Sequence, residues 1–259
     1  MKSLKILLTN QQGCFHPGIV ALAKVLSASH QVIIAAPLRS QYNRGHALTT
    51  RRPLKSGQYT VLKRVKFFSI DGTPNDAVAL AMDKLVKSKP DLVISGIAPH
   101  NNVGEKVYAS GVVSSATLGT IHGIPSIAIS ASVKDDKDES EYTQIAKAFA
   151  KKLGILYNNI PEAVTLNVNF PRRAGVKKIK YTHLTCLGHG DHEYEYEVNP
   201  FGQGYYFMKP HDHDNSLARL EDRGDVYWLK QNFITVTPLK HDLTNKGAFE
   251  ILENSGVTL

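Results

Sequence analysis

The sequence predicts an α/β protein with a Rossmann-like, mostly parallel sheet that carries helices on both faces, followed by a β-rich C-terminal extension. Two observations lead to this prediction. Over the first two-thirds of the 259 residues, short apolar runs alternate with segments whose apolar residues recur at helical spacing, a rhythm typical of doubly wound sheets. After Pro171 the chain instead shows aromatic, strand-like stretches separated by Gly and Pro. We therefore expect a core over residues 1–170 and an extension over residues 171–259.

Each expected element rests on its apolar pattern and on the residues that bound it. The core strands are expected at residues 4–9, 31–36, 91–95, 126–130 and 163–168, with an extended stretch at 59–70. The helices are expected at residues 17–27, 74–86, 111–122 and 140–157. Pro17 suits a first helical turn, and Thr73 with Asp76 three residues later approaches the capping-box pattern. In the extension, the strand-like stretches are 177–187, 193–198, 205–208 and 233–237.

The composition favours a soluble, cytoplasmic protein with an anionic partner. Lys and Arg number 31 against 23 Asp and Glu, so the formal net charge is +8, which attracts phosphates and nucleotides. The two cysteines, Cys14 and Cys186, are too few for a disulfide framework and fit a reducing compartment. No apolar run approaches the roughly 20 residues that a membrane helix needs, and the first run is too short for a signal peptide.

Three loops are expected to form the site, because ligands of doubly wound sheets bind beyond the carboxyl ends of the strands. They span residues 10–16, 37–52 and 96–110, and together they contain five cations and one acid, Glu105. Loops so poor in carboxylates suit an anion better than Mg²⁺ or Mn²⁺. At a predicted helix start, Ser110 and Gly111 add free backbone N–H groups and the positive end of the helix dipole.

Other reaction classes lack their motifs. A cysteine-dependent phosphatase needs an Arg six positions after its thiolate, but Val20 and His192 stand there. The chain has no G-x-S-x-G elbow, no P-loop and no G-x-G-x-x-G fingerprint. The sequence therefore gives no support to a thiol or serine hydrolase, an NTPase or a dinucleotide enzyme.

The histidines leave two interpretations open. The His-rich segments 189–192 and 211–214 are interpreted as solvated turns, because their spacing is unlike that of a zinc site. His16, His46 and His100 lie in the three site loops, where each would either donate to a phosphate or a reacting group, or cap a turn.

Short motifs also recur in order along nearly the whole chain. They are ILLTN at 6–10, PGI at 17–19, AP at 36–37, HALT at 46–49, GTPND at 72–76, DLVISG at 91–96, NVG at 102–104, SG at 110–111, GIPSIAIS at 123–130, NPFG at 199–202, YY at 205–206, ITVTPL at 234–239 and LTN at 243–245. In this set the chain resembles the stationary-phase survival protein SurE family. The resemblance implies a metal-dependent phosphatase of nucleoside monophosphates, active in some members on polyphosphate, that assembles as dimers or tetramers through the extension.

The resemblance also implies a metal site, and this chain departs from it. The family's ligands are two adjacent Asp in an Asn-Asp-Asp-Gly loop, a Ser in the second loop and an Asn in a Ser-Gly-x-Asn segment. The matching positions here are Gln11, Gln12, Tyr42 and Ala98. Two Gln bring no charge to a hard divalent ion, the phenol stays neutral with a pKa near 10, and Ala98 offers no ligand. We therefore expect the Mn²⁺ or Mg²⁺ site to be absent, and predict no bound metal or cofactor.

By lineage we interpret the chain as a SurE-like 5′/3′-nucleotidase whose catalysis is impaired or lost and which retains nucleotide or phosphate binding. Two alternatives stay open. One is an active metal-dependent nucleotidase with a rearranged site, its metal held by Glu105, Asp76 or a histidine. The other is a non-catalytic structural or regulatory oligomer.

No residue is assigned to catalysis, and phosphate or nucleotide binding is assigned to nine residues of the three loops. They are Asn10, Gly13, Arg39, Arg44, His46, Asn102, Lys106, Ser110 and Gly111. The expected partners are a nucleoside monophosphate or another phosphate-bearing small molecule, and further copies of this chain in a homodimer or tetramer. Neither a membrane nor a nucleic acid is expected as a partner.

Overall fold

The computed structural model describes residues 2–172, 179–184, 194–198, 206–210 and 223–255, and centres on one nine-stranded sheet. The strand order is β3-β4-β2-β1-β5-β6-β7-β11-β8. These strands are β1 (Lys5–Thr9), β2 (Gln31–Pro37), β3 (Ser56–Tyr59), β4 (Lys66–Ile70), β5 (Leu92–Ala98), β6 (Ser126–Ala131), β7 (Val164–Phe170), β8 (Ile179–Tyr181) and β11 (Ile234–Lys240). Six of the eight strand pairings are parallel, and only β3–β4 and β7–β11 are antiparallel. The predicted α/β fold with a mostly parallel sheet is confirmed.

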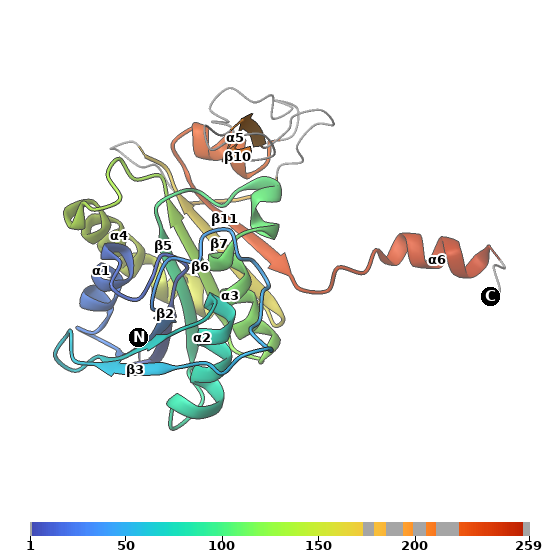
Figure 1. Ribbon diagram of the computed structural model, residues 1–259. Helices are drawn as coiled ribbons and strands as arrows, with labels where there is room; N and C mark the ends of the chain where they lie inside the picture. The colour runs from blue at the N-terminus through green and yellow to red at the C-terminus, as the bar shows by residue number, and fades with distance from the viewer. Residues whose placement is uncertain (1, 173–178, 185–193, 199–205, 211–222, 256–259) are drawn as a thin grey trace.

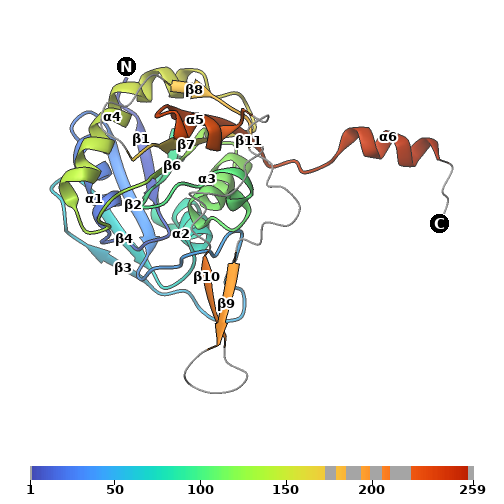
Figure 2. The ribbon, with the colours of Figure 1, turned by 90° about the horizontal axis from the view of Figure 1, so that it is seen from above.

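Helices cover both faces of this sheet (Figures 1 and 2). The helical segments are α1 (Pro17–Leu26), α2 (Pro74–Leu80), the single π turn η1 (Ala81–Leu85), the 3₁₀ turn η2 (Gly104–Tyr108), α3 (Gly111–Ile121), α4 (Glu139–Asn158), α5 (Asp225–Lys230) and α6 (Lys246–Asn254). Helices α1 and α4 pack together on one face, and α2 and α3 on the other. No helix in the described ranges is long and apolar enough to cross a membrane.

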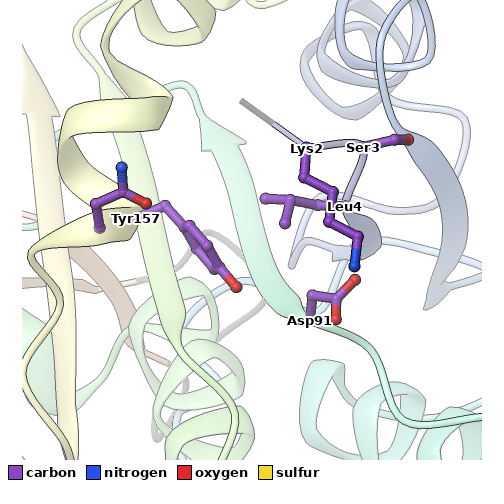
Figure 3. Close-up of a pocket in the computed structure, with 6 residues that line it drawn as sticks. Lys2, Ser3, Leu4, Asp91 and Tyr157 are labelled. Atoms are coloured by element: carbon purple, nitrogen blue, oxygen red, sulfur yellow. The ribbon is translucent and has the colours of Figure 1, made fainter.

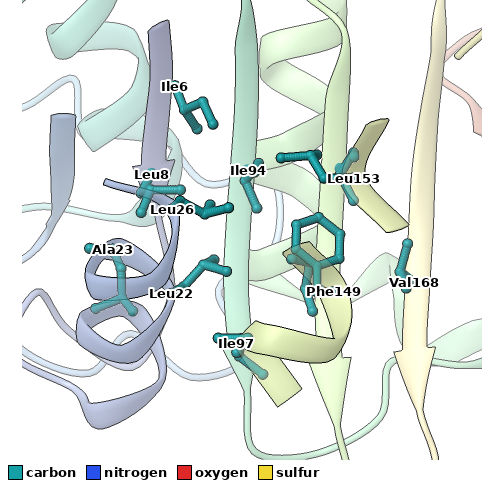
Figure 4. Close-up of a cluster of buried hydrophobic side chains, with 14 of the residues drawn as sticks. Ile6, Leu8, Leu22, Ala23, Leu26, Ile94, Ile97, Phe149, Leu153 and Val168 are labelled. Atoms are coloured by element: carbon teal, nitrogen blue, oxygen red, sulfur yellow. The ribbon is translucent and has the colours of Figure 1, made fainter. Parts of the chain in front are cut away.

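The larger core lies between the sheet and the α1–α4 layer. Figure 4 shows Leu22 and Leu26 of α1 and Phe149 and Leu153 of α4 directed at Ile94 of the central strand β5, and all five side chains are buried. Burying side chains of this size contributes about 1.5–3 kcal/mol each. This packing fixes the central strands, and with them the loops at their carboxyl ends.

The structure corrects one expectation about local structure. The stretch 59–70, expected to be extended throughout, is interrupted by a turn in which Val65 N–H donates to Leu62 O and Arg64 adopts φ +69°. Strand β3 ends and strand β4 begins on either side of this turn. The described residues of the extension form strands, as expected, and also helices α5 and α6.

The extension contributes strands to two sheets. Strand β11 pairs antiparallel with β7 and parallel with β8, so both strands complete the main sheet. Strands β9 (Tyr194–Val198) and β10 (Tyr206–Pro210) form a separate two-stranded ladder. The His-rich segments 189–192 and 211–214 lie outside the described residues.

Asp76 joins the start of α2 to the loop that follows β2. As expected from the sequence, Thr73 and Asp76 form a complete capping box. Asp76 also accepts hydrogen bonds from Thr49 N–H at 2.8 Å and from Thr49 Oγ1 at 2.6 Å. Burial raises the pKa of this carboxyl, but the hydrogen bonds from Thr49 and Thr73 outweigh it, so the pKa lies below its usual value.

Replacing Asp76 by Ala is expected to lower the free energy of unfolding by about 1–3 kcal/mol at pH 7, because buried donors lose a charged acceptor. Since the folded-state pKa is depressed, this contribution is present above the unfolded pKa of about 3.9 and is lost as pH falls through the folded pKa. Urea unfolding of both proteins at pH 7 and near pH 3 measures this. The control Asp71→Ala removes only an exposed ion pair with Arg52. Equal losses for both variants, or a loss independent of pH, would contradict the assignment.

Candidate functional site

The three loops expected to form the site do meet at the carboxyl ends of the strands. Gln41 N–H donates to Gln11 O at 2.7 Å, which joins the first loop to the second. Gly45 N–H donates to Ala109 O at 2.9 Å, which joins the second loop to the third. At Gly45 an added Cβ would lie 2.6 Å from Tyr108 O, so only glycine permits this approach. The site is therefore built from the ends of β1, β2 and β5 and from the start of α3.

Gln11 lies at the centre of these contacts. Its side chain is buried, and its Oε1 accepts a hydrogen bond from Gly111 N–H, the first residue of α3, at 2.8 Å. Ser110 caps the same helix by accepting from Val113 N–H at 3.2 Å. A neutral carboxamide therefore occupies the helix start at which the sequence indicated an anion.

The neighbouring Gln12 has the opposite character. Its Oε1 and Nε2 are both buried, and neither has a hydrogen-bond partner among the described residues. The same is true of Thr9 Oγ1, two residues before Gln11. Buried polar groups are nearly always paired, so unpaired donors and acceptors beside a loop cluster mark a place where a ligand or water completes the site.

The donors of this site do not suit a hard divalent cation. Mg²⁺ and Mn²⁺ prefer carboxylate and other oxygen ligands, but Gln11 and Gln12 are neutral and Gln11 Oε1 is already bonded to Gly111. Ala98 is buried and brings no donor. In the part of the chain that the structure describes, no three His, Cys, Asp or Glu side chains are close enough to hold a metal ion.

Tyr42 and His100 form an aromatic pair that joins the second loop to the third. Their ring centroids lie 6.1 Å apart, edge to face, with Tyr42 on the second loop and His100 just after β5. Tyr42 is 48% exposed, and its partial burial raises the pKa of the phenol. It therefore stays protonated at neutral pH.

A second polar cluster surrounds Asp136, in the loop after β6. Its Oδ1 accepts from His16 Nε2 and from Tyr142 OH, each at 2.7 Å. His16 Nδ1 accepts from Gly18 N–H at the start of α1, so His16 caps the helix and holds Asp136 at once. Burial raises the Asp136 pKa, but the Tyr142 and His16 hydrogen bonds and the charges of His16 and His100 bring it below its usual value.

Sequence reasoning missed Asp136 and Tyr142. A signal was present, because a strand at residues 126–130 in a parallel sheet must send its following loop to the same edge as the other site loops. The acidic run 135–141 follows that strand. Which of its carboxylates points at His16 depends on the fold of the loop, and residue types alone do not determine it.

The nine residues assigned to phosphate or nucleotide binding fall into three groups. Asn10 closes the first loop by bonding Gly13 N–H and Gly13 O, and Gly13 has φ +111°. Asn102 is buried, and its amide donates to Ser130 Oγ at 2.7 Å. Ser110 and Gly111 form the α3 cap described above. The remaining four are exposed residues of the second and third loops, and are Arg39, Arg44, His46 and Lys106.

Two other features lie apart from this chemistry. A cavity of about 400 Å³ is lined by Lys2, Asp91 and Tyr157, among others, at the amino ends of β1 and β5, opposite the site (Figure 3). Cys14 is buried, and burial raises the pKa of its thiol to about 11. It is therefore a core residue and not a nucleophile.

Comparison with known proteins agrees with this architecture. Residues 6–192 match the family model described as survival protein SurE. The 5′-nucleotidase SurE of Natranaerobius thermophilus is 35% identical over 261 residues, covering 97% of this chain and 98% of the relative. That of Carboxydothermus hydrogenoformans is 38% identical over 250 residues, covering 93% and 92%. The crystal structure of the SurE protein from Aquifex aeolicus is 33% identical, with a TM-score of 0.78 over 97% of this chain and 99% of that one.

The match extends over nearly the full length of each relative, and the fold agrees with that of the solved structure. The chain belongs to the SurE family, and its lineage is that of the 5′-nucleotidases.

Proposed function

We propose that this chain binds a nucleoside monophosphate, or another small phosphate-bearing molecule, and has lost the metal-dependent hydrolysis of its lineage. One observation carries the proposal, namely the 2.8 Å hydrogen bond from Gly111 N–H to Gln11 Oε1. Because of this bond, a neutral carboxamide that is already hydrogen-bonded occupies the position where the family resemblance implies a metal-binding carboxylate. A divalent ion would gain no charge neutralisation there, so it could neither polarise a phosphoryl group nor activate water.

The nearby carboxylates support the same proposal, because each already has partners. The Asp76 carboxylate accepts three hydrogen bonds, two from Thr49 and one from Thr73 N–H, and caps α2. Asp136 accepts from His16 and Tyr142. Glu105 is exposed on η2. A rearranged metal site built on any of these would first have to break a local structure or recruit distant ligands.

Binding of the phosphate itself is supported by the cations of the second and third loops. Arg39, Arg44 and Lys106 are exposed, and none forms an ion pair with a carboxylate in the described ranges. Arg44 follows the backbone link to Gln41 and precedes Gly45, which packs against the third loop. Its position is therefore held relative to Gln12, whose unpaired Nε2 is a further donor. Arg44 is the residue on which we expect nucleotide binding to depend most.

The direct test is hydrolysis of a nucleoside monophosphate panel with Mn²⁺ and with chelator. The unmodified chain is expected to show no metal-dependent turnover. The control carries Gln11→Asp, Gln12→Asp, Tyr42→Ser and Ala98→Asn, and is expected to hydrolyse the panel only with metal. Rapid, metal-dependent turnover by the unmodified chain would show that it is an active nucleotidase.

Binding is tested separately by thermal stabilisation. At a nucleotide concentration of 100 times Kd, a ligand that binds only the folded state stabilises it by about 2.7 kcal/mol. Arg44→Ala is expected to abolish most of this shift, because an Arg–phosphate bond is charge-assisted. Lys147→Ala removes the same charge from an exposed position on α4 and should leave the shift unchanged. Equal shifts for Arg44→Ala and the unmodified chain would show that the phosphate does not bind at Arg44.

We also propose that the chain associates with further copies of itself through α6. This helix extends away from the body (Figure 1) and none of its residues is buried. It exposes Phe249, Ile251 and Leu252 at 57%, 71% and 64%. A nine-residue helix is marginal in water on its own, and this one cannot reach its own core. A second copy of the chain has the same helix, and in a symmetric assembly the apolar side chains of both α6 helices become covered.

The paired change Phe249→Asp and Leu252→Asp is expected to convert the assembly to a monomer of 28.5 kDa. It removes about 1.5–3 kcal/mol of burial for each side chain. Changing Glu250 and Glu253 to Gln on the same helix is the control. Sedimentation measures the outcome. An unmodified chain that sediments as a monomer, or a double variant that assembles normally, would contradict this proposal.

A further inference from the structure

The net charge of this protein resides in one segment of the chain. Residues 37–70 hold eight of the 31 Lys and Arg and no Asp or Glu. The other parts of the chain therefore carry 23 residues of each sign and are formally neutral. The whole excess of +8 belongs to a stretch that starts at the site and ends with β4.

The fold places this segment along one edge of the sheet. From the end of β2 it passes over the starts of α2 and α3, and then forms the edge strand β3 and its neighbour β4 (Figures 1 and 2). All eight cations are exposed: Arg39, Arg44, Arg51, Arg52, Lys55, Lys63, Arg64 and Lys66. Arg52 pairs with Asp71, and the other seven have no carboxylate within ion-pair distance in the described part of the chain. Protein surfaces normally interleave acidic and basic side chains, whereas residues 37–70 contain no acidic ones.

Aromatic rings are exposed among these cations. Phe15 and Tyr42 are each 48% exposed, and Tyr59 is 42% exposed. The Phe15 ring lies edge-on to Tyr59 with centroids 5.3 Å apart, and stacks on Phe67 at 5.2 Å. Phe15 belongs to the first site loop and Tyr59 ends β3, so the rings connect the site with the cations of the β3–β4 turn.

A mononucleotide does not account for so long a surface. A phosphate monoester carries about two negative charges at neutral pH, whereas this segment presents eight exposed cations over two strands and a loop. Unpaired cations interleaved with exposed rings are the features that bind single-stranded nucleic acid, where cations follow the phosphates and bases stack on the rings. A solvated charged face explains the cations but not the rings.

We propose that residues 37–70, with Phe15, form a binding track for single-stranded nucleic acid that leads into the Gln11–Gln12 site. The proposal rests on the proposed function only in assigning the terminal nucleotide of the strand to that site. It revises the expectation that nucleic acid is not a partner. The structure shows that the cations run from the site loop after β2, at the carboxyl end of that strand, to the β3–β4 turn at the amino end of β4.

The test measures binding of a fluorescent oligothymidylate of about twelve nucleotides, within the range of known single-strand site sizes, over a series of salt concentrations. Each phosphate contact contributes about 0.7 to the salt slope. The variant with Lys63→Ala, Arg64→Ala and Lys66→Ala is therefore expected to bind more weakly, with a slope lower by about 2. The matched control, Lys87→Ala, Lys89→Ala and Lys147→Ala, removes the same charge from other exposed positions. Equal weakening by both triple variants would overturn the track.

The rings distinguish nucleic acid from other polyanions. Tyr59→Ala is expected to weaken oligothymidylate binding at least about fivefold and to leave binding of inorganic polyphosphate, which has no bases, unchanged. Tyr42→Ala repeats the test at a ring on the other side of the site, in case Tyr59→Ala alters the β3 edge. Two outcomes would overturn the proposal. One is that the Tyr→Ala variants lose binding of oligothymidylate and of polyphosphate equally, and the other is that the chain binds anionic lipid vesicles but not the oligonucleotide.

The two proposals fail separately. If the oligonucleotide binds with the expected salt slope but nucleoside monophosphate does not stabilise the chain, the binding track is supported and the proposed function is refuted. Nucleotide stabilisation without oligonucleotide binding refutes the track alone.

Discussion

The hydrogen bond from Gly111 N–H to Gln11 Oε1 joins the end of β1 to the start of α3, and the arrangement of the site depends on it. Gln11 O accepts in turn from Gln41 N–H, so one residue ties the first loop to the second loop and to the helix. Because Gln11 is buried, these bonds are protected from water. The centre of the site is thereby neutral and fixed, and the cations of its loops are exposed.

This distribution of charge separates anion binding from metal chemistry. Carboxylates that could serve a metal are bonded elsewhere, Asp76 at the α2 cap and Asp136 to His16 and Tyr142. The cations, in contrast, are exposed and mostly unpaired along the segment 37–70. Gln11 and Gln12 offer no charged oxygen to a metal, and a phosphate group would meet exposed cations on the second and third loops. This distribution of charge is the basis on which we propose binding of a phosphate group and of a negatively charged chain.

The sequence predicted the sheet, the helices of the core and the meeting of three loops, because each follows from local apolar periodicity and from the direction of parallel strands. It predicted the α2 capping box from Thr73 and Asp76 alone. It did not predict α6, none of whose residues is buried in the described part of the chain. Nor did it predict the contact of Asp136 with His16, 120 positions away, which only the folded loops create. Nor could it predict the hydrogen-bond partners of Gln11 and Gln12. Two adjacent residues of the same type differ here, because Gln11 Oε1 accepts from Gly111 N–H, whereas the Gln12 amide has no partner among the described residues.

The most direct measurement is a calorimetric titration of the purified chain with Mn²⁺, beside the variant that carries Gln11→Asp, Gln12→Asp, Tyr42→Ser and Ala98→Asn. A site of neutral carboxamides gives a hard cation no charged oxygen, so the account predicts no saturable binding to the unmodified chain and binding of about one ion per chain to the variant. Saturable binding of Mn²⁺ to the unmodified chain, abolished by Gln11→Ala, would contradict the central claim that this site has left metal chemistry.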